Sequence, residues 1–177
     1  MPRIVAGSAG GRRLATPAGA ATRPTSDRVR EALFSTLGDL TGLRVLDGYA
    51  GSGAVGLEAL SRGAAHALLV ESDGAALAAV RANVAALGLA AHVHAGDFAR
   101  LVTGAPDRPY DVVFLDPPYA EPVDAVVAAL GAHGWLADGA TLVVERSSRS
   151  REPTWPPGVQ ARPRAYGETT LWYVRAP

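Results

Sequence analysis

The chain has 177 residues, 17 basic and 17 acidic side chains, and no cysteine. This length is typical of one domain with a single core. The lack of cysteine excludes a disulfide framework, a thiolate nucleophile and a cysteine metal site, as is usual in a reducing cytoplasm. No apolar run approaches the roughly 18 residues of a membrane span, and the N-terminus lacks the apolar segment of a signal peptide. We therefore expect a cytoplasmic protein without membrane contact.

Charge is distributed unevenly along the chain. Residues 1–30 hold six arginines and one acid, and residues 146–177 hold six arginines and two acids. The ends therefore carry +5 and +4, while the middle, with five arginines and fourteen acids, carries −9. If the fold brings the ends together, they form a positive surface for a polyanion; otherwise they are solvated tails. The sequence leaves both interpretations open.

Residues 1–24 are predicted to form a basic N-terminal arm ahead of a single domain over residues 25–177. The arm is rich in Gly, Ala, Arg and Pro and contains at most one short strand, near residues 3–6. Thr25 or Ser26 can cap the helix that follows. Apolar residues then recur every three to four positions and make one helix face: Val29, Leu33, Leu37 and Leu40.

From residue 43 the pattern alternates between strands and helices. Apolar runs predict five strands, over residues 43–47, 67–71, 92–95, 111–115 and 141–145. Helices are predicted between them over residues 55–62, 74–87 and 122–130, the second ending before Gly88, since helices often end at a left-handed glycine. This alternation implies right-handed crossovers and a mostly parallel sheet with helices on both faces.

The alternation stops after the fifth strand. The turn-rich stretch 146–158 matches no distinctive pattern, and we assign no function to it. Segments 159–166 and 169–174 meet across Gly167-Glu168 with no helix between them, which predicts an antiparallel hairpin at the sheet edge. The predicted fold class is therefore α/β: a Rossmann-like, mostly parallel seven-stranded sheet with a C-terminal antiparallel hairpin.

The loop after the first strand carries a G-x-G-x-x-G motif at Gly51, Gly53 and Gly56. Glycines at this turn let the backbone approach a ligand closely, and the N-terminus of the next helix favours a negative group. Glu71 ends the second strand, where a carboxylate can bind the hydroxyls of a ribose. These features suit both NAD and S-adenosylmethionine, because each contains an adenosine ribose.

Acidic residues favour the second cofactor. Asp47 ends the first strand with three residues between it and Gly51. An acid there suits the ammonium and sulfonium of S-adenosylmethionine but would repel a pyrophosphate. After the third strand, Asp97 can accept from the adenine amino group, or simply cap a helix, and Phe98 offers a face for the ring. With Asp116, four acids stand at four successive strand ends and indicate one site.

The fourth strand runs into Asp116-Pro117-Pro118-Tyr119. Two prolines prevent the strand from continuing, so the acid and the aromatic ring lie at the carboxyl edge of the sheet, where open α/β sheets bind ligands. The tetrapeptide offers a carboxylate, a Pro117 carbonyl outside any ladder and a flat ring. This combination can hold a planar amine and accept its hydrogens. The alternative is a strand followed by a simple Pro-Pro turn.

In these motifs the chain resembles the class I S-adenosylmethionine-dependent methyltransferases, and among them the amino-methylating group with the signature D-P-P-Y. More closely, it is similar to the RsmD-type family of 16S ribosomal RNA guanine-N2 methyltransferases. The family-specific stretches are R-P-T-S-D-R-V-R-E-A-L-F at 23–34 and Y-G-E-T at 166–169, supported by matches at 4–7, 10–12, 50–53, 56–64 and 116–119. The chain departs from the family at Gly48-Tyr49, where Leu-Phe is usual.

The resemblance implies S-adenosylmethionine-dependent methylation of the N2 amine of a guanine in 16S rRNA, free or in an assembled or partly assembled small ribosomal subunit. The cofactor-binding residues would be Asp47, Gly51, Ser52, Gly53, Glu71, Asp97 and Phe98.

The catalytic residues would be Asp116, Pro117 and Tyr119: the carboxylate and the carbonyl each accept one N–H, and the ring stacks on the extruded base. Arg12 and Arg13 are candidates for phosphate contacts. Arg23 and Thr25 are candidates for the pocket wall, and we expect no metal, because the four histidines lack ligand spacing.

Three alternatives remain at this point. D-P-P-Y also serves adenine-N6 methylation of DNA or RNA, because the tetrapeptide holds any exocyclic amine alike. A nicotinamide-binding regulatory module would use the glycine loop, although Asp47 argues against it. A non-catalytic RNA-binding assembly factor would keep the fold, although an intact D-P-P-Y argues against that.

Overall fold

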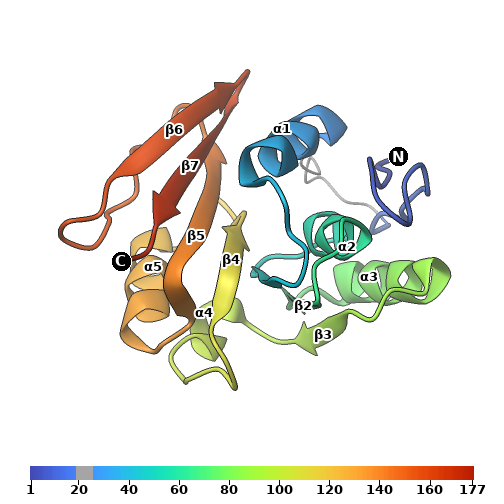
Figure 1. Ribbon diagram of the computed structural model, residues 1–177, viewed down its shortest axis with the longest axis horizontal. Coiled ribbons are helices and arrows are strands. Elements are labelled where there is room, and N and C mark those ends of the chain that lie inside the picture. Colours follow the sequence, from blue (N-terminus) through green and yellow to red (C-terminus); the bar gives the residue numbers. More distant parts are fainter. Residues whose placement is uncertain (19–25) are drawn as a thin grey trace.

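The computed structural model describes residues 1–18 and 26–177, whose strands form a seven-stranded sheet in the order β3-β2-β1-β4-β5-β7-β6 (Figure 1). The first five strands pair in parallel, whereas β7 is antiparallel to both β5 and β6. The predicted fold class, with its hairpin at the sheet edge, is confirmed. The strands are β1 (Arg44–Asp47), β2 (His66–Glu71), β3 (His92–Ala95), β4 (Tyr110–Leu115), β5 (Leu136–Ser147), β6 (Ala161–Tyr166) and β7 (Thr169–Arg175).

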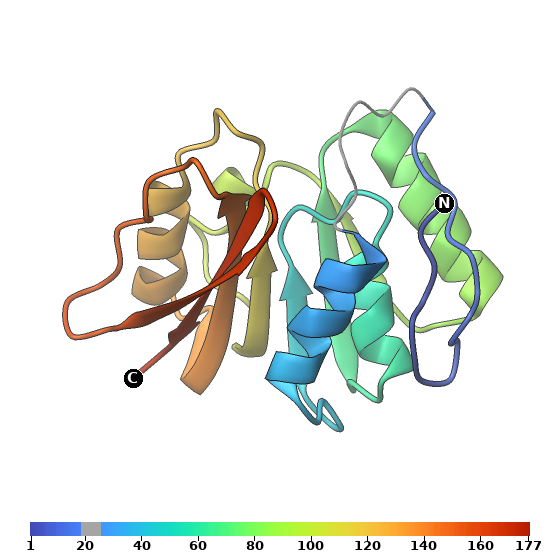
Figure 2. The same ribbon diagram turned by 90° about the horizontal axis from the view of Figure 1, so that it is seen from above.

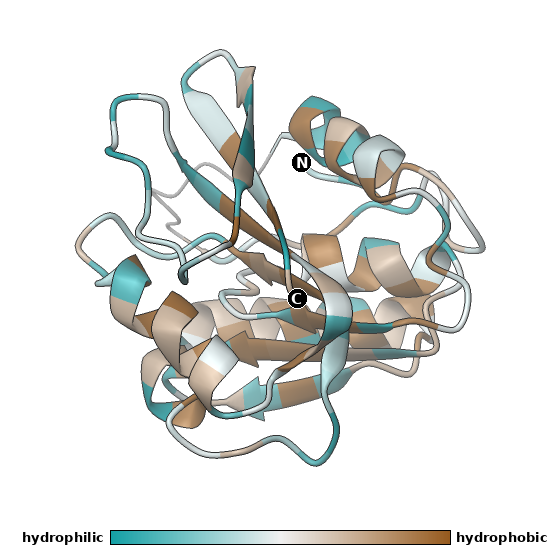
Figure 3. Cartoon of the chain, turned by 60° about the vertical axis from the view of Figure 1, so that its left-hand side comes forward, coloured by the Kyte–Doolittle hydropathy of each residue, from teal (hydrophilic) through white to brown (hydrophobic). Residues whose placement is uncertain are grey.

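Helices cover both faces of the sheet (Figure 2). Val113 and Leu115 of β4 pack into a cluster with α5, while Val112 and Phe114 pack with α1 and α2 on the opposite face. Central strands buried on both faces read as continuous apolar runs, and Figure 3 shows them as brown ribbons. The helices are α1 (Asp27–Leu37), α2 (Ala54–Ser61), α3 (Gly74–Leu87), α4 (Phe98–Leu101) and α5 (Val123–Ala132).

The predicted helix boundaries agree best where a cap marks them. Ser26 caps α1 by accepting from the Val29 N–H, and Gly88 ends α3 with φ 65°. The other proposed cap, Thr25, lies outside the described residues. α1 ends at Leu37, earlier than predicted, because Gly38 adopts φ 76°. Leu40 therefore lies in the loop after the helix, but its side chain packs in the same core cluster as the buried residues of α1.

Two further elements differ from the predictions. α4 was not predicted, because a single turn of four residues shows no helical periodicity. β5 starts at Leu136, five residues before the predicted start at 141, and its pairing with β4 shifts register between Tyr110 and Val112. The polar pair Asp138-Gly139 interrupts the apolar pattern there, with Gly139 at φ 68°.

The first residues of the expected arm are docked on the domain. Ile4 and Leu14 are fully buried against α2 and α3. The buried Glu58 carboxylate of α2 accepts the backbone N–H groups of Val5 and Ala6, at 2.7 and 3.0 Å. Arg30 of α1 is also fully buried and donates to the Arg3 carbonyl. Backbone groups that find partners on the domain hold this segment in place.

The stretch that matched no pattern, residues 146–158, extends β5 through Ser147 and then contacts the first turn of α5. Asp124 of α5 accepts from the Arg151 guanidinium at 2.5 Å and from the Thr154 N–H at 2.9 Å. These bonds hold the pKa of Asp124 below its usual range. Trp155 packs on Trp172 of β7, with ring centroids 6.4 Å apart. The stretch therefore joins α5 to the hairpin strand.

The basic arm and the basic hairpin lie at opposite sides of the molecule. In Figures 1 and 2 the N-terminus lies beyond α2 and α3, whereas β6 and β7 lie at the other end of the sheet. The fold therefore does not join Arg3, Arg12 and Arg13 to the hairpin arginines in one surface, which was the condition for a combined polyanion site. Within residues 1–18 and 26–177, no helix is long and apolar enough to cross a membrane.

Candidate active site

The four acids predicted to share a site line one cavity of about 940 Å³ at the carboxyl edge of the sheet. Asp47 ends β1 and Glu71 ends β2, while Asp97 and Asp116 follow β3 and β4. Because parallel strands end at the same edge, residues far apart in sequence meet there. The cavity is also lined by the predicted cofactor residues Gly51, Ser52 and Phe98.

The three glycines of the motif have different surroundings: a side chain at Gly51 would meet open space, whereas one at Gly53 or Gly56 would meet packed side chains. Gly51 lies at the cavity with φ 54°, a conformation that favours glycine. Gly53 does not line the cavity; it begins α2 with φ 83°, and a Cβ there would lie 2.6 Å from Val80. A Cβ on Gly56 would likewise lie 2.8 Å from the Leu69 side chain. The second and third glycines therefore let α2 and the loop pack closely on their neighbours.

The departure at Gly48-Tyr49 has a packing reason. A Cβ on Gly48 would lie 2.7 Å from Leu115 and 2.8 Å from the Phe98 ring, so this glycine lets both side chains approach the loop. The Tyr49 ring meets Phe98 edge to face, with centroids 5.3 Å apart. Burial raises the pKa of Tyr49 above its usual range. An aromatic pair thus forms one wall of the cavity.

Asp47 is the most perturbed acid of the cavity. It is 1% exposed, and its Oδ2 accepts the Gly56 N–H at 3.1 Å, while its Oδ1 has no hydrogen-bond partner among the described residues. Burial raises the pKa of Asp47 to about 7; the Gly56 bond lowers it, and the charges of Asp116 and Glu71 raise it further. Mutually repelling carboxylates and an unpaired buried oxygen make this site complementary to a cation.

Glu71 holds the glycine loop through its carboxylate. Its Oε2 accepts the Gly51 N–H at 2.8 Å, and its Oε1 accepts the N–H groups of Ser72 and Asp73, both at 2.8 Å. A carboxylate offers about four acceptor positions, so Glu71 retains capacity for a ribose hydroxyl. Its predicted role as a ribose ligand remains a prediction.

Asp97 and Phe98 are placed at the cavity but are partly engaged elsewhere. Asp97 caps α4 by accepting the Arg100 N–H at 2.7 Å, which is the alternative role considered for this residue. Phe98 is 2% exposed, so most of its ring packs in the core and little of it is offered to a ligand. Both remain predictions as adenine contacts.

Three of the four D-P-P-Y residues, Asp116, Pro117 and Tyr119, border a second cavity of about 340 Å³ between β5 and the hairpin turn. Asp116 and Pro117 line both cavities, whereas Tyr119 lines the second one alone. Tyr119 is 79% exposed, so its ring is available for stacking. Burial raises the pKa of Asp116 to about 6, against the opposing charge of Arg146. The two cavities therefore meet at the carboxylate and carbonyl predicted to hold an amine.

Arg146 of β5 is a site residue that the sequence analysis did not identify. Its guanidinium donates to the carbonyls of Pro117 at 3.3 Å and Tyr119 at 3.2 Å, and it lies 5.8 Å from the centre of the Tyr119 ring. The Pro117 carbonyl is outside any ladder, as predicted, but it already has one partner. A carbonyl has two lone pairs, so one acceptor position remains for a ligand.

Asn83 of α3 is a second residue that the sequence analysis missed. This buried side chain donates to the Ser52 carbonyl of the glycine loop at 2.8 Å. It also exchanges two hydrogen bonds with Ala15, at 2.7 and 3.0 Å, and the chain then continues along the first cavity through residues 16–18. Its only signal in the sequence was being the single asparagine. Asn83 thus joins the arm to the glycine loop.

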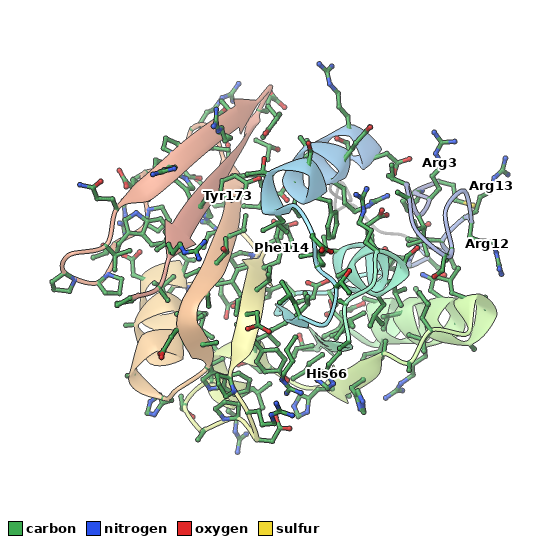
Figure 4. All side chains as sticks on the ribbon, in the orientation of Figure 1. Arg3, Arg12, Arg13, His66, Phe114 and Tyr173 are labelled. Atoms are coloured by element: carbon green, nitrogen blue, oxygen red, sulfur yellow. The ribbon has the colours of Figure 1, made fainter. Side chains whose placement is uncertain are left out.

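Of the proposed RNA contacts, Arg12 and Arg13 line neither cavity. Arg12 and Arg13 are exposed on the N-terminal segment, on the side of the molecule away from the hairpin (Figure 4). Arg12 donates to the Ala86 carbonyl at 2.7 Å, at the carboxyl end of α3, whereas the first cavity lies at the amino end of this helix. Arg23 lies outside the described residues, as Thr25 does. Exposed Arg149, which we had not singled out, lines the second cavity.

Comparison with known proteins places these features in a family. Residues 2–175 match the family model described as "Conserved hypothetical protein 95". The chain is 40% identical over 158 residues to the "Ribosomal RNA small subunit methyltransferase D" of Escherichia coli strain K12, covering 87% of this chain and 79% of that protein. It is 37% identical over 174 residues to YlbH of Bacillus subtilis, which is named as a putative rRNA methyltransferase. The match covers 94% of this chain and 95% of that protein.

A solved structure of Escherichia coli yhhF, named as a putative methyltransferase, is similar to this chain. It superposes with a TM-score of 0.89 at 36% identity and covers 99% of this chain and 97% of its own. The agreement extends over the arm, the sheet and the terminal hairpin, because almost the whole of both chains is aligned.

Proposed function

This chain belongs to the RsmD family of methyltransferases, and we propose that it methylates the exocyclic N2 amine of a guanine in 16S rRNA of the small ribosomal subunit. The methyl donor in this proposal is S-adenosylmethionine. The names of the relatives support ribosomal RNA as the substrate. Guanine and the donor rest on the chemistry of the site and on the resemblance of its motifs.

One observation carries the proposal: two cavities meet at Asp116 and Pro117. A transferase must place a donor and an acceptor on either side of one point, with the reacting atoms in contact. The first cavity, of about 940 Å³, has room for a nucleoside-sized cofactor, and the second, of about 340 Å³, has room for a base. The carboxylate and the carbonyl stand between them.

The residues of the first cavity fit a cationic donor. Asp47, with its unpaired buried oxygen, would hold a positive group, and Glu71 would hold the ribose hydroxyls beside Gly51. Asp97 and Phe98 would bound the adenine. When bound there, S-adenosylmethionine would supply an electrophilic methyl group for transfer to the amine nitrogen.

Asp116 and Pro117 would make the amine a better nucleophile. The lone pair of the guanine N2 amine is delocalised into the ring, and two acceptors on its hydrogens draw the nitrogen toward tetrahedral geometry. After transfer the nitrogen is cationic and must lose a proton. Asp116, with its pKa raised to about 6, is a better proton acceptor than an ordinary aspartate and is still mostly ionised at pH 7.

Tyr119 and the nearby arginines would hold the RNA. Stacking of the exposed Tyr119 ring on an extruded base contributes about 1–3 kcal/mol and is tolerant of base identity. Exposed Arg149 beside the second cavity would contact the backbone phosphates of the target nucleotide. Arg12 and Arg13, away from the cavities, would contact more distant phosphates of a folded RNA.

The test is to map modified nucleosides in 16S rRNA from cells with and without this chain, and after tritium transfer by the purified protein. We expect one N2-methylguanosine to disappear in cells that lack the chain and to be restored by the protein in vitro. N6-methyladenosine as the product would overturn the proposal in favour of adenine methylation. Binding of NADH in preference to S-adenosylmethionine would favour the nicotinamide module instead.

A further inference from the structure

Glu145 is a half-buried carboxylate of β5 that lines the second cavity together with Asp116. The described ladder between β4 and β5 ends with the pair Leu115 and Val144. Asp116 and Glu145 are the next residues on the two strands. Neighbouring strands lie about 4.8 Å apart, so extending this register by one residue places the two about one strand spacing from each other.

Extended by one residue beyond the ladder, the pleat places both carboxylates on the same face of the sheet, in agreement with their shared cavity. Phe114 and its partner Val143 belong to the core cluster on the α1 and α2 face, whereas Leu115 and Val144 belong to the cluster on the α5 face. Side chains alternate along a strand, so the next pair returns to the first face. The cavity that receives the target base therefore has two neighbouring carboxylates on one wall.

We propose that Glu145 selects guanine over adenine by accepting the N1–H of the target base. The inference rests on the proposed function, because it assigns the base that Asp116 and Pro117 hold. Those two groups bind any exocyclic amine alike and do not discriminate between bases. A further acceptor, placed next to the amine, would distinguish guanine from adenine.

The two purines differ at the ring nitrogen next to the amine. In guanine the N2 amine is adjacent to N1–H, a donor, whereas in adenine the N6 amine is adjacent to N1, an acceptor. A carboxylate therefore forms a charge-assisted hydrogen bond with guanine and faces a lone pair in adenine. A site built to bond a substrate N–H rejects analogues that lack it by large factors, because its own polar group is left unpaired.

The surroundings of Glu145 suit this role. A carboxylate offers about four acceptor positions, so Glu145 can receive N1–H while keeping its contacts within the protein. Arg146 and Arg149 line the same cavity and offset the charge of two neighbouring acids. Glu145 does not line the first cavity, so its substitution separates base selection from cofactor binding.

The experiment compares guanine with 2-aminopurine at the mapped target position of the RNA substrate. 2-Aminopurine keeps the 2-amine but has no N1–H. We expect the wild-type protein to methylate guanine at least about 100-fold faster in kcat/KM. In Glu145→Gln, whose amide can donate to an unprotonated N1, we expect this ratio to fall at least about tenfold, with S-adenosylmethionine affinity within about twofold of wild type.

Glu168→Gln is the matched control. Glu168 also lines the second cavity, but it lies on the exposed hairpin turn, and we expect its variant to keep the wild-type preference for guanine. An unchanged ratio in Glu145→Gln, or an equal loss of preference in Glu168→Gln, would overturn the inference.

A second measurement needs no variant and therefore does not depend on the folding of one. Equal rates of wild-type protein on guanine and 2-aminopurine would also overturn the inference. Failure of the proposed function looks different: the wild-type protein would then methylate adenine, or no base at all. If the protein methylates guanine N2 but Glu145→Gln leaves the ratio of rates on guanine and 2-aminopurine unchanged, the proposed function stands and only the role of Glu145 is refuted.

Discussion

Arg146 donates to the Pro117 carbonyl at 3.3 Å, across 29 positions of sequence, and thereby joins β5 to the tetrapeptide that would hold the amine. The same guanidinium reaches the Tyr119 carbonyl at 3.2 Å and lowers the pKa of Asp116. One side chain therefore contacts the backbone on both sides of Pro118 and favours the ionised form of Asp116. This makes Arg146 a positioning residue for the whole tetrapeptide.

Arg146→Ala should lower kcat about 10- to 100-fold at pH 6.5 and shift the acidic limb of the pH–rate profile to higher pH. The reason is that Arg146 lowers the pKa of Asp116, so its removal raises that pKa further above the usual range. Measurement of kcat from pH 5 to 9 checks this. Arg146→Lys should keep the position of the limb, because it keeps the charge. A uniform loss at all pH values would assign Arg146 a purely structural role.

Asp116→Asn should reduce methyl transfer by at least about 10³-fold, because the amide removes the charged acceptor and the proton acceptor together. S-adenosylmethionine affinity should stay within a few-fold, since Asp47 and Glu71 are the acids proposed to hold the cofactor. Single-turnover transfer and calorimetric titration of the cofactor give the two numbers. Loss of cofactor binding with equal severity would make this acid structural.

The affinity for S-adenosylmethionine should rise as pH increases from 5.5 to 8. Asp47 has its pKa raised to about 7, and a cation in the first cavity favours its ionised form, so binding releases a proton. In Asp47→Asn the affinity should be lower and should depend less on pH over this range. Titrations at four pH values test this prediction, and an unchanged pH dependence in the variant would contradict it.

The same shift affects the stability of the unliganded protein. A carboxyl with a raised folded pKa contributes stability that is present below its unfolded pKa of 3.8 and is lost as pH rises toward about 7. We therefore expect the Tm of Asp47→Asn to exceed that of wild type by a margin that grows between pH 5 and pH 8. Thermal melts without cofactor measure this margin, and a margin that shrinks with pH would refute the assignment.

Asn83→Ala should lower the free energy of unfolding by about 2–3 kcal/mol, because it leaves the Ser52 carbonyl and both backbone groups of Ala15 without their partner. It should also weaken S-adenosylmethionine binding, since the glycine loop and the arm both border the first cavity. Denaturant titration and cofactor binding provide the readouts. Arg81→Ala, an exposed change on the same helix, is the control and should alter stability by less than about 0.5 kcal/mol.

Replacement of Arg12 and Arg13 by alanine should flatten the salt dependence of RNA binding by about one to two units of slope, if both contact phosphates as proposed. Single-turnover transfer at saturating RNA should be unchanged, because neither residue lines a cavity. Binding measured between 50 and 300 mM salt tests the slope. An unaltered slope would remove the arm from the RNA contacts.

The positions of the four acids follow from the sequence because each one ends or follows a parallel strand. Parallel strands joined by crossovers finish at one edge, so Asp47, Glu71, Asp97 and Asp116 had to meet once the alternation of strands and helices was identified. The prolines after Asp116 act locally as well, since they end the strand wherever it lies. Local rules were sufficient for this part of the site.

Only the tertiary structure shows which residues far apart in sequence contact each other. Asn83 meets Ala15 across 68 positions and Arg146 meets Pro117 across 29, and no periodicity marks such pairs. The position of Phe98 after a strand end predicts a contact with a ligand. Its ring instead packs mostly in the core, because Gly48 has no side chain to occupy that space. The two ends of the chain, both rich in arginine, lie on opposite sides of the sheet. Strand order and close packing determine these outcomes, because they set which surfaces meet, whereas the sequence determines what each surface carries.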